Sequence, residues 1–226
     1  MTNFSSPVEL SAVDLASLLC ARVCHDLVSP VSALGTALDV LDDDDAADMR
    51  DEALELIRTS AGQASAKLEF ARLAYGAGTS APGQVPTSEL KRLVDGMFKN
   101  AKAKIIWRVS AASLSKPASR ILLNLVLLGV EAAPRGGEIT VEAASESRLR
   151  VLAQGDRARL LPIVANSLEG IEPENGFDGR SIQPYYTGLI ARDLGGRAEA
   201  RGNGESIELI ALTRVDAANE LHAKVV

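Results

Sequence analysis

The chain has 226 residues, a formal net charge of −6 at pH 7, 46% hydrophobic residues and two cysteines. This length suits a helical module plus a second small core, because one domain commonly uses about 100–200 residues. The acidic balance speaks against general affinity for nucleic acid or anionic membrane, since both need a basic surface. No segment reaches the roughly 20 apolar residues that span a bilayer, and the N-terminus lacks the pattern of a secretion signal. We therefore expect a soluble, cytoplasmic protein that binds neither nucleic acid nor membrane.

The two cysteines, Cys20 and Cys24, are four residues apart and so share one face of a predicted helix rather than forming a disulfide framework. We expect both to be reduced, buried thiols, the usual state of free cysteine. A metal site would need about four ligands, and the chain has only two histidines. The sequence therefore predicts no metal and no cofactor held by this chain.

Apolar residues recur at three- and four-residue steps from Asp14 to Leu41, which indicates one long amphipathic helix. The pattern breaks at four adjacent aspartates, of which Asp45 is expected to cap the next helix. From Ala46 to Tyr75 the stripe resumes with mostly small side chains. The two stripes are Leu15, Leu19, Val23, Leu27, Val31, Leu34, Leu38 and Leu41, then Leu54, Ile57, Ala61, Ala64, Leu68, Ala71 and Tyr75. They predict an antiparallel helical hairpin.

Two helices alone cover only one side of each apolar stripe, so the hairpin needs a partner. Pairing two hairpins in a homodimer would give a four-helix bundle, which is the economical solution. Packing of the rest of the chain along the hairpin is the alternative, and the sequence leaves it open.

A stretch rich in Gly, Pro and Ser runs from Gly76 to Pro86 without periodicity and predicts a linker. We therefore divide the chain into a hairpin at residues 1–76, a linker at 77–86 and a second domain at 87–226. In the second domain, helices are expected at 87–100, 115–132, 158–166 and 184–194, and strands at 105–109, 138–144, 149–153, 197–201 and 206–212, with a turn at 202–204. The fold class is α+β: a helical hairpin followed by an α/β sandwich, a mixed sheet with helices on one face.

His25 lies on the solvent side of the first predicted helix. It is about 200° around the helix from both Val23 and Leu27, so it points away from the apolar stripe. A lone exposed histidine is ordinarily a solvated side chain, but a phosphoryl carrier needs an exposed neutral imidazole, which is a nucleophile near neutral pH. Pro30 removes a backbone donor and frees the carbonyl of Asp26, at a cost of about 3 kcal/mol or more. That cost indicates a compensating role for this segment.

Two charged neighbours could assist His25. Asp26 is expected to orient the imidazole or to accept its proton. Arg22, three residues earlier on the same helix face, is expected to neutralise charge on a transferring phosphoryl group. An ordinary surface arginine is the equal alternative for Arg22.

The order His25, Asp26, three residues, Pro30 resembles the H-box of histidine-kinase dimerisation domains. The second domain supports this resemblance. The helix from Ile121 to Leu125, followed by a proline–glycine turn and a strand up to Val141, is similar to the surroundings of the asparagine box in a kinase ATP-binding domain. Residues 188–197 resemble the last helix and following strand of that domain.

The sequence lacks three features that the nucleotide site of such a kinase has. The asparagine that would hold Mg²⁺ falls on Leu128, which offers no oxygen ligand. In such kinases an aspartate–x–glycine–x–glycine turn binds the adenine amino group through its aspartate. Here Ala153 stands at the aspartate position, Gly155 at the first glycine and Arg157 at the second glycine. The glycine-rich lid is absent from residues 170–187. The resemblance thus implies a retained fold without its nucleotide chemistry.

A kinase-like hairpin followed by a disabled ATP domain resembles the ChpT family of alphaproteobacterial histidine phosphotransferases, from Ala12 to Thr213. The resemblance implies a homodimer in which the receiver domain of a hybrid histidine kinase phosphorylates His25. The group then passes to response-regulator receivers, including the cell-cycle regulator CtrA and the proteolysis adaptor CpdR. Mg²⁺ is expected to be supplied by the partner receiver.

Receiver active sites gather carboxylates, so an acidic carrier needs a local positive surface to meet one. Four arginines stand near the position of the glycine-rich turn of an ATP domain: Arg148, Arg150, Arg157 and Arg159. We expect Arg157 and Arg159 to contact the receiver, together with Leu18 and Ser29 on the face of His25. The alternative is a solvated loop whose arginines pair with nearby glutamates.

Two other functions are weighed against phosphotransfer. The first is an ATP-using histidine kinase, against which Leu128 and Ala153 speak. The second is a non-catalytic dimeric scaffold that binds receivers, against which His25 and Pro30 speak. His222 is the weaker candidate for a phosphoryl acceptor, because it lies in a short polar tail.

Overall fold

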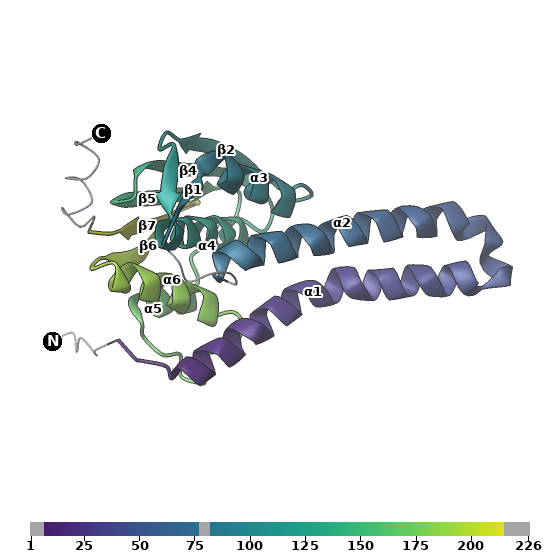
Figure 1. Ribbon diagram of the computed structural model, residues 1–226, viewed down its shortest axis with the longest axis horizontal. Helices are drawn as coiled ribbons and strands as arrows, with labels where there is room; N and C mark the ends of the chain where they lie inside the picture. Colours follow the sequence, from purple (N-terminus) through teal and green to yellow (C-terminus); the bar gives the residue numbers. More distant parts are fainter. Residues whose placement is uncertain (1–6, 77–81, 215–226) are drawn as a thin grey trace.

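A long helical hairpin leads into an α/β domain in the computed structural model, which describes residues 7–76 and 82–214 (Figure 1). Helix α1 (Ala12–Asp42) begins after Ser11, whose hydroxyl accepts a hydrogen bond from the backbone N–H of Asp14 at 3.1 Å. A short 3₁₀ helix, η1 (Asp44–Met49), makes the turn, and α2 (Arg50–Ala74) returns. The predicted hairpin is confirmed, but the expected cap is wrong. Asp43 caps η1, and α2 begins at Arg50 without a side-chain cap.

The hairpin extends away from the second domain for much of its length (Figure 1). The residues that it buries where α1 and α2 meet are mainly small, among them Ala37, Ala53 and Ser60. Small side chains let two helices approach closely. Several large apolar side chains of the same helices stay exposed: Val28, Val31, Leu38, Leu56 and Leu68.

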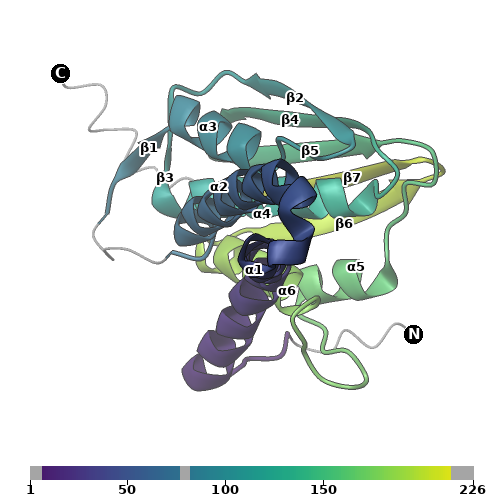
Figure 2. The ribbon, with the colours of Figure 1, turned by 90° about the vertical axis from the view of Figure 1, so that its right-hand side faces the viewer.

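The second domain is built on a five-stranded sheet in the order β2-β4-β5-β7-β6. Its strands are β2 (Ala103–Val109), β4 (Gly137–Ser145), β5 (Arg148–Gln154), β6 (Arg197–Asn203) and β7 (Ser206–Leu212). β2 pairs with β4 in parallel, and the other pairs are antiparallel. The domain's helices are α3 (Thr87–Met97), α4 (Lys116–Ala132), α5 (Pro162–Glu169) and α6 (Ile182–Asp193). This is the predicted mixed sheet with helices on one face (Figure 2).

Helix α4 forms the centre of the core, because it packs against β5 and β7 on one side and against α2 and α6 on the other. The whole run from Ile121 to Leu128 is buried. A helix that is apolar all round is expected only where neighbours surround it. Gly129 lets α4 lie close to the sheet, since a Cβ there would stand 2.7 Å from Cγ1 of Val151.

Three local expectations are wrong. Gln84–Pro86, expected in the linker, forms strand β1 and pairs with β3 (Ser113–Ser115). The helix expected at 158–166 begins only at Pro162, because the preceding segment is held by a turn and by the bond from the N–H of Arg159 to the carbonyl of Ala132. Residues 202 and 203, expected in the turn, belong to β6.

The cysteine expectation is also wrong. Cys20 and Cys24 are both free thiols, but both are exposed on α1 rather than buried. The second domain covers another side of this helix, and the sequence pattern could not show which side. Within residues 7–76 and 82–214, no helix combines the length and the apolar character that crossing a membrane would need.

Candidate functional site

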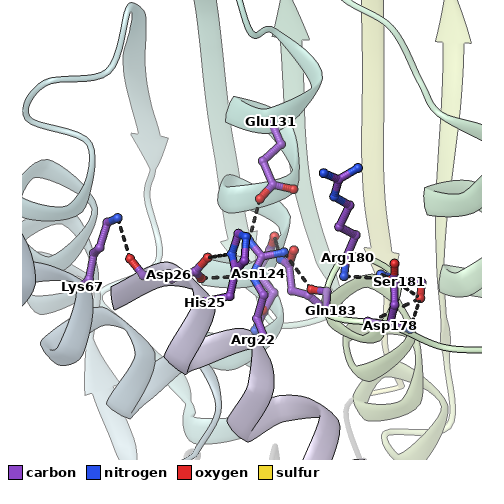
Figure 3. Close-up of polar contacts among 11 residues, drawn as sticks. Arg22, His25, Asp26, Lys67, Asn124, Glu131, Asp178, Arg180, Ser181 and Gln183 are labelled. Carbon is purple, nitrogen blue, oxygen red and sulfur yellow. Dashed lines mark hydrogen bonds and ion pairs between the residues drawn. The ribbon is translucent and has the colours of Figure 1, made fainter. Parts of the chain in front are cut away.

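His25 is the most exposed member of a polar group on α1, with 79% of its side chain accessible. Its Nδ1 lies 3.4 Å from Oδ1 of Asp26, a distance at the long end of the hydrogen-bond range (Figure 3). When Nδ1–H donates to this carboxylate, Nε2 carries the free lone pair. The arrangement therefore presents a nucleophilic nitrogen to solvent. The expected exposure of His25 is found, and Asp26 is in place to orient it.

Arg22 is buried, with only 6% of its surface accessible. Its guanidinium donates to Oδ2 of Asp26 at 3.0 Å, to Oε1 of Glu131 at 2.6 Å and to the carbonyl of Gly179 at 3.2 Å. Glu131 is at the end of α4, and Gly179 belongs to the loop before α6. The expectation of Arg22 on the open face beside His25 is wrong, because the second domain covers this side of α1.

The charge of Arg22 is already compensated within the protein. Burial alone would lower the pKa of its guanidinium, but the carboxylates of Glu131 and Asp26 outweigh burial and hold that pKa above its ordinary value. Arg22 thus fixes one oxygen of Asp26 while the other faces His25. It acts as a clamp on Asp26 rather than as a free cation for an incoming phosphoryl group.

The two other residues expected on this face of α1, Leu18 and Ser29, differ in their exposure. Ser29 is exposed, and Leu18 is half-buried. Ser29 lies one turn after His25 on α1, and Leu18 lies two turns before it.

Leu128 and Ala153 occupy the two positions at which the resemblance to kinases would place a metal ligand and an adenine ligand. Leu128 and Ala153 are both buried in the core. Leu128 also lines a shallow recess, together with Glu131, Arg159 and Leu161 among others. Gly155 is kept for a steric reason, because a Cβ there would stand 2.3 Å from the carbonyl oxygen of Gly136. Its presence is explained by packing and needs no nucleotide.

The four arginines do not form one cluster. Arg148 and Arg150 lie near the start of β5, and Arg150 is paired with Glu142 and Glu208 across the sheet. Arg157 and Arg159 follow the other end of β5, and both are exposed. Arg157 has a φ of 63°, the left-handed conformation that glycine adopts most readily. Among the described residues, no ion pair involves Arg157 or Arg159.

Known proteins share both the sequence and the fold of this chain. Residues 87–206 match the family described as histidine phosphotransferase C-terminal domain. The chain is 37% identical over 206 residues to protein phosphotransferase ChpT of Brucella abortus (strain 2308), a match that spans 90% of this chain and 97% of that protein. The chain belongs to the histidine phosphotransferase family. The predicted family is therefore confirmed, and with it a phosphotransferase activity.

A solved structure described as a bacterial phosphotransferase also resembles this member of the histidine phosphotransferase family. It superposes with a TM-score of 0.81 at 35% sequence identity, over 91% of this chain and 99% of that chain. The expected α+β architecture, a hairpin followed by a kinase-like domain, is confirmed.

In this histidine phosphotransferase, several contacts tie the second domain to the hairpin. Nδ2 of Asn124 donates to the carbonyl of Ala74 at the end of α2, at 2.9 Å. Within the second domain, Gln183 of α6 donates to the carbonyl of Asn124 at 3.0 Å (Figure 3). Tyr185 donates to the carbonyl of Val8, ahead of α1, at 3.0 Å. Asn124 is therefore part of the contact between the second domain and the hairpin.

Sequence reasoning missed Glu131 and Lys67. Glu131 gave no signal, because its partner Arg22 is 109 residues away. Lys67 donates from Nζ to the backbone carbonyl of Asp26 at 2.7 Å. Pro30 did signal that this carbonyl needs a donor from elsewhere, but not which residue supplies it. His222 lies outside the described residues.

Proposed function

We propose that His25 is the phosphoryl acceptor of this phosphotransferase, carrying the group between receiver-domain aspartates in a multistep phosphorelay. The observation that supports this role is the exposed imidazole whose Nδ1 faces a clamped carboxylate, Oδ1 of Asp26 at 3.4 Å. His25 is the one histidine among residues 7–76 and 82–214, and a histidine phosphotransferase needs a histidine as its carrier.

The transfer can be written with these groups. The lone pair on Nε2 of His25 attacks the phosphorus of an aspartyl phosphate in the receiver, a bond from phosphorus to nitrogen forms, and the bond to the aspartate oxygen breaks with its electrons on the leaving carboxylate. Asp26 stabilises the positive charge that develops on the ring by accepting from Nδ1–H. A second receiver reverses the step, its aspartate attacking the phosphohistidine. We propose that the receiver supplies the Mg²⁺, because Leu128 and Ala153 leave this chain without the oxygen ligands of a kinase.

The partners that fit are receivers. We propose the receiver of a hybrid histidine kinase as the donor and response-regulator receivers of the CtrA and CpdR kind as acceptors, which would place the protein in the cytoplasm and in cell-cycle control. For docking we propose the His25 face of α1, with Leu18 and Ser29, together with Arg157 and Arg159. The recess that Arg159 lines also contains Glu131, the partner of Arg22 on α1, so the two surfaces adjoin.

The active unit that we propose is a homodimer. The hairpin leaves Val31 and Leu38 of α1 and Leu56 and Leu68 of α2 exposed, although each is large and apolar. A second copy of the hairpin would cover them in a four-helix bundle. The second domain packs at the base of the hairpin (Figure 1), and these four side chains remain exposed.

Mass spectrometry without acid tests the central proposal. The full chain is incubated with a receiver domain phosphorylated by acetyl phosphate, and one phosphoryl group should be found on His25. His25→Ala should fold normally, because an exposed helical position tolerates alanine, and should accept nothing. A phosphoryl group found on this variant, for example on His222, would contradict the assignment of His25 as the acceptor. Binding of the phosphorylated receiver without any label would instead favour a non-catalytic scaffold.

A further inference from the structure

The backbone next to His25 contains a carbonyl that its own helix cannot satisfy. In α1 the carbonyl of Asp26 would accept from the N–H of residue 30, but that residue is proline and has no N–H. Pro30 is buried, and α1 nevertheless continues to Asp42. The free carbonyl is thus a fixed feature of the helix one residue after His25.

Lys67 of α2 supplies the missing donor. Its Nζ lies 2.7 Å from the carbonyl oxygen of Asp26 (Figure 3). Lys67 also borders an open groove between α2 and the end of α3, which Lys99 lines. The ammonium group of Lys67 could therefore point into the solvent of this groove. It points instead between the helices, to the carbonyl of Asp26 that Pro30 leaves without a donor. The contact bonds α2 to α1 at the level of His25.

Asp26 is consequently held at two points. Its carboxylate is clamped by Arg22 at 3.0 Å, and its carbonyl by Lys67 at 2.7 Å. His25, the adjacent residue, makes only the 3.4 Å contact to Asp26 and is otherwise exposed. The direction of the imidazole therefore depends on how firmly the backbone of Asp26 is held.

We infer that Lys67 is a positioning residue for phosphoryl transfer: by replacing the hydrogen bond that Pro30 removes, it fixes the backbone that presents His25 to the receiver. This inference rests on the proposed role of His25. It predicts that Lys67 acts on the rate of transfer within the complex and not on the binding of the receiver, because its ammonium faces the interior of the hairpin.

A double-mutant cycle tests this role, using the full chain and a receiver that labels the wild type. Lys67→Met should lower the transfer rate at saturating receiver by about tenfold and leave the half-saturating concentration unchanged. Lys67→Arg, which keeps a donor, should restore part of the rate. In the Pro30→Ala background the helix supplies its own N–H to Asp26, so Lys67→Met should change the rate by less than about twofold. Lys99→Met removes the same charge from the same groove and serves as the control.

The outcomes are distinct. A wild type that no phosphorylated receiver labels would contradict the role of His25, and the role of Lys67 with it. A labelled wild type with an equally fast Lys67→Met variant would overturn the positioning role alone, as would an equal loss in both backgrounds. If Pro30→Ala transfers too slowly to measure, thermal unfolding replaces the rates. Lys67→Met should then lower the midpoint only where Pro30 is present, and an equal lowering in both backgrounds would refute the inference.

Discussion

Arg22 and Glu131 join the two domains through a hydrogen-bonded ion pair of 2.6 Å between α1 and the end of α4. Arg22 is almost fully buried, whereas Glu131 keeps about half of its side chain in solvent. The pair therefore differs from the exposed ion pairs of the surface, because its cationic partner cannot turn to water when the carboxylate is lost.

Glu131→Ala should lower the free energy of unfolding by roughly 2 kcal/mol, the usual effect of losing a hydrogen bond to a buried charge. The matched control is Glu69→Ala, which removes the exposed partner of Arg92 and should cost less than about 1 kcal/mol. Denaturant unfolding of both variants measures the difference. Equal effects would mean that the contact between Arg22 and Glu131 does not stabilise the domain arrangement.

The burial of Leu128 and Ala153 leads to a second prediction. Calorimetry with ATP and Mg²⁺ should show no binding, and incubation with labelled ATP should leave the protein unlabelled. Leu128 and Ala153 offer neither a metal ligand nor an acceptor for the adenine amino group, and both are buried. Micromolar affinity for ATP would contradict this reading of the second domain and revive the histidine-kinase alternative.

The elements could largely be predicted, because each carries its own periodicity. The hairpin, the order of helices and strands and the sheet's helix-covered face all follow from local patterns, as the helix predicted at 115–132 and found as α4 (Lys116–Ala132) illustrates. The exposure of His25 could be predicted for the same reason, since its position around α1 depends only on its distance from Val23 and Leu27.

The contacts between elements could not be predicted. Arg22 and Cys24 stand on the same helix, yet the second domain buries the first and leaves the second exposed. That difference depends on where α4 and the loop at Gly179 meet α1, and no local pattern records it. Strand β1 was missed because Gln84–Pro86 has no alternation of its own and is ordered by pairing with β3.

The exposed apolar residues of the hairpin lead to a prediction on the oligomeric state. Leu68→Glu should convert a dimer into monomers or aggregates, because it places an unpaired charge in the seam of the proposed bundle. Gln63→Glu adds the same charge on an exposed position of α2 that borders the groove with α3, and should stay dimeric. Light scattering measures both. A well-folded monomeric wild type would contradict the proposed bundle.

Arg157 leads to a prediction on stability. A side chain other than glycine in the left-handed region costs about 1–2 kcal/mol, and Arg157 has a φ of 63°. Arg157→Gly should therefore raise the free energy of unfolding by roughly 0.5–1 kcal/mol, once the greater freedom of glycine in the unfolded chain is subtracted. Arg157→Ala keeps the strain and should give no gain. Denaturant unfolding that ranks the two variants alike would show that the loop relaxes the strain in another way.

The exposed side chains of Arg157 and Arg159 lead to the last prediction, which tests the receiver docking that we propose. If Arg157 and Arg159 meet the carboxylates of a receiver, changing both to Glu should slow transfer by about tenfold at low salt and weaken its salt dependence, because electrostatic steering then opposes the encounter.

The control reverses the same number of charges elsewhere. Arg148→Glu with Arg214→Glu changes two exposed arginines at the opposite end of β5, where the N–H of Thr213 donates to the carbonyl of Ser147. This variant should transfer to His25 at close to the wild-type rate, since the change in net charge is identical and only its position differs. Stopped-flow or rapid-quench kinetics at several salt concentrations separate the two variants. If both pairs slow transfer equally, net charge alone governs the encounter, and receiver docking is confined to the α1 face that holds Leu18 and Ser29.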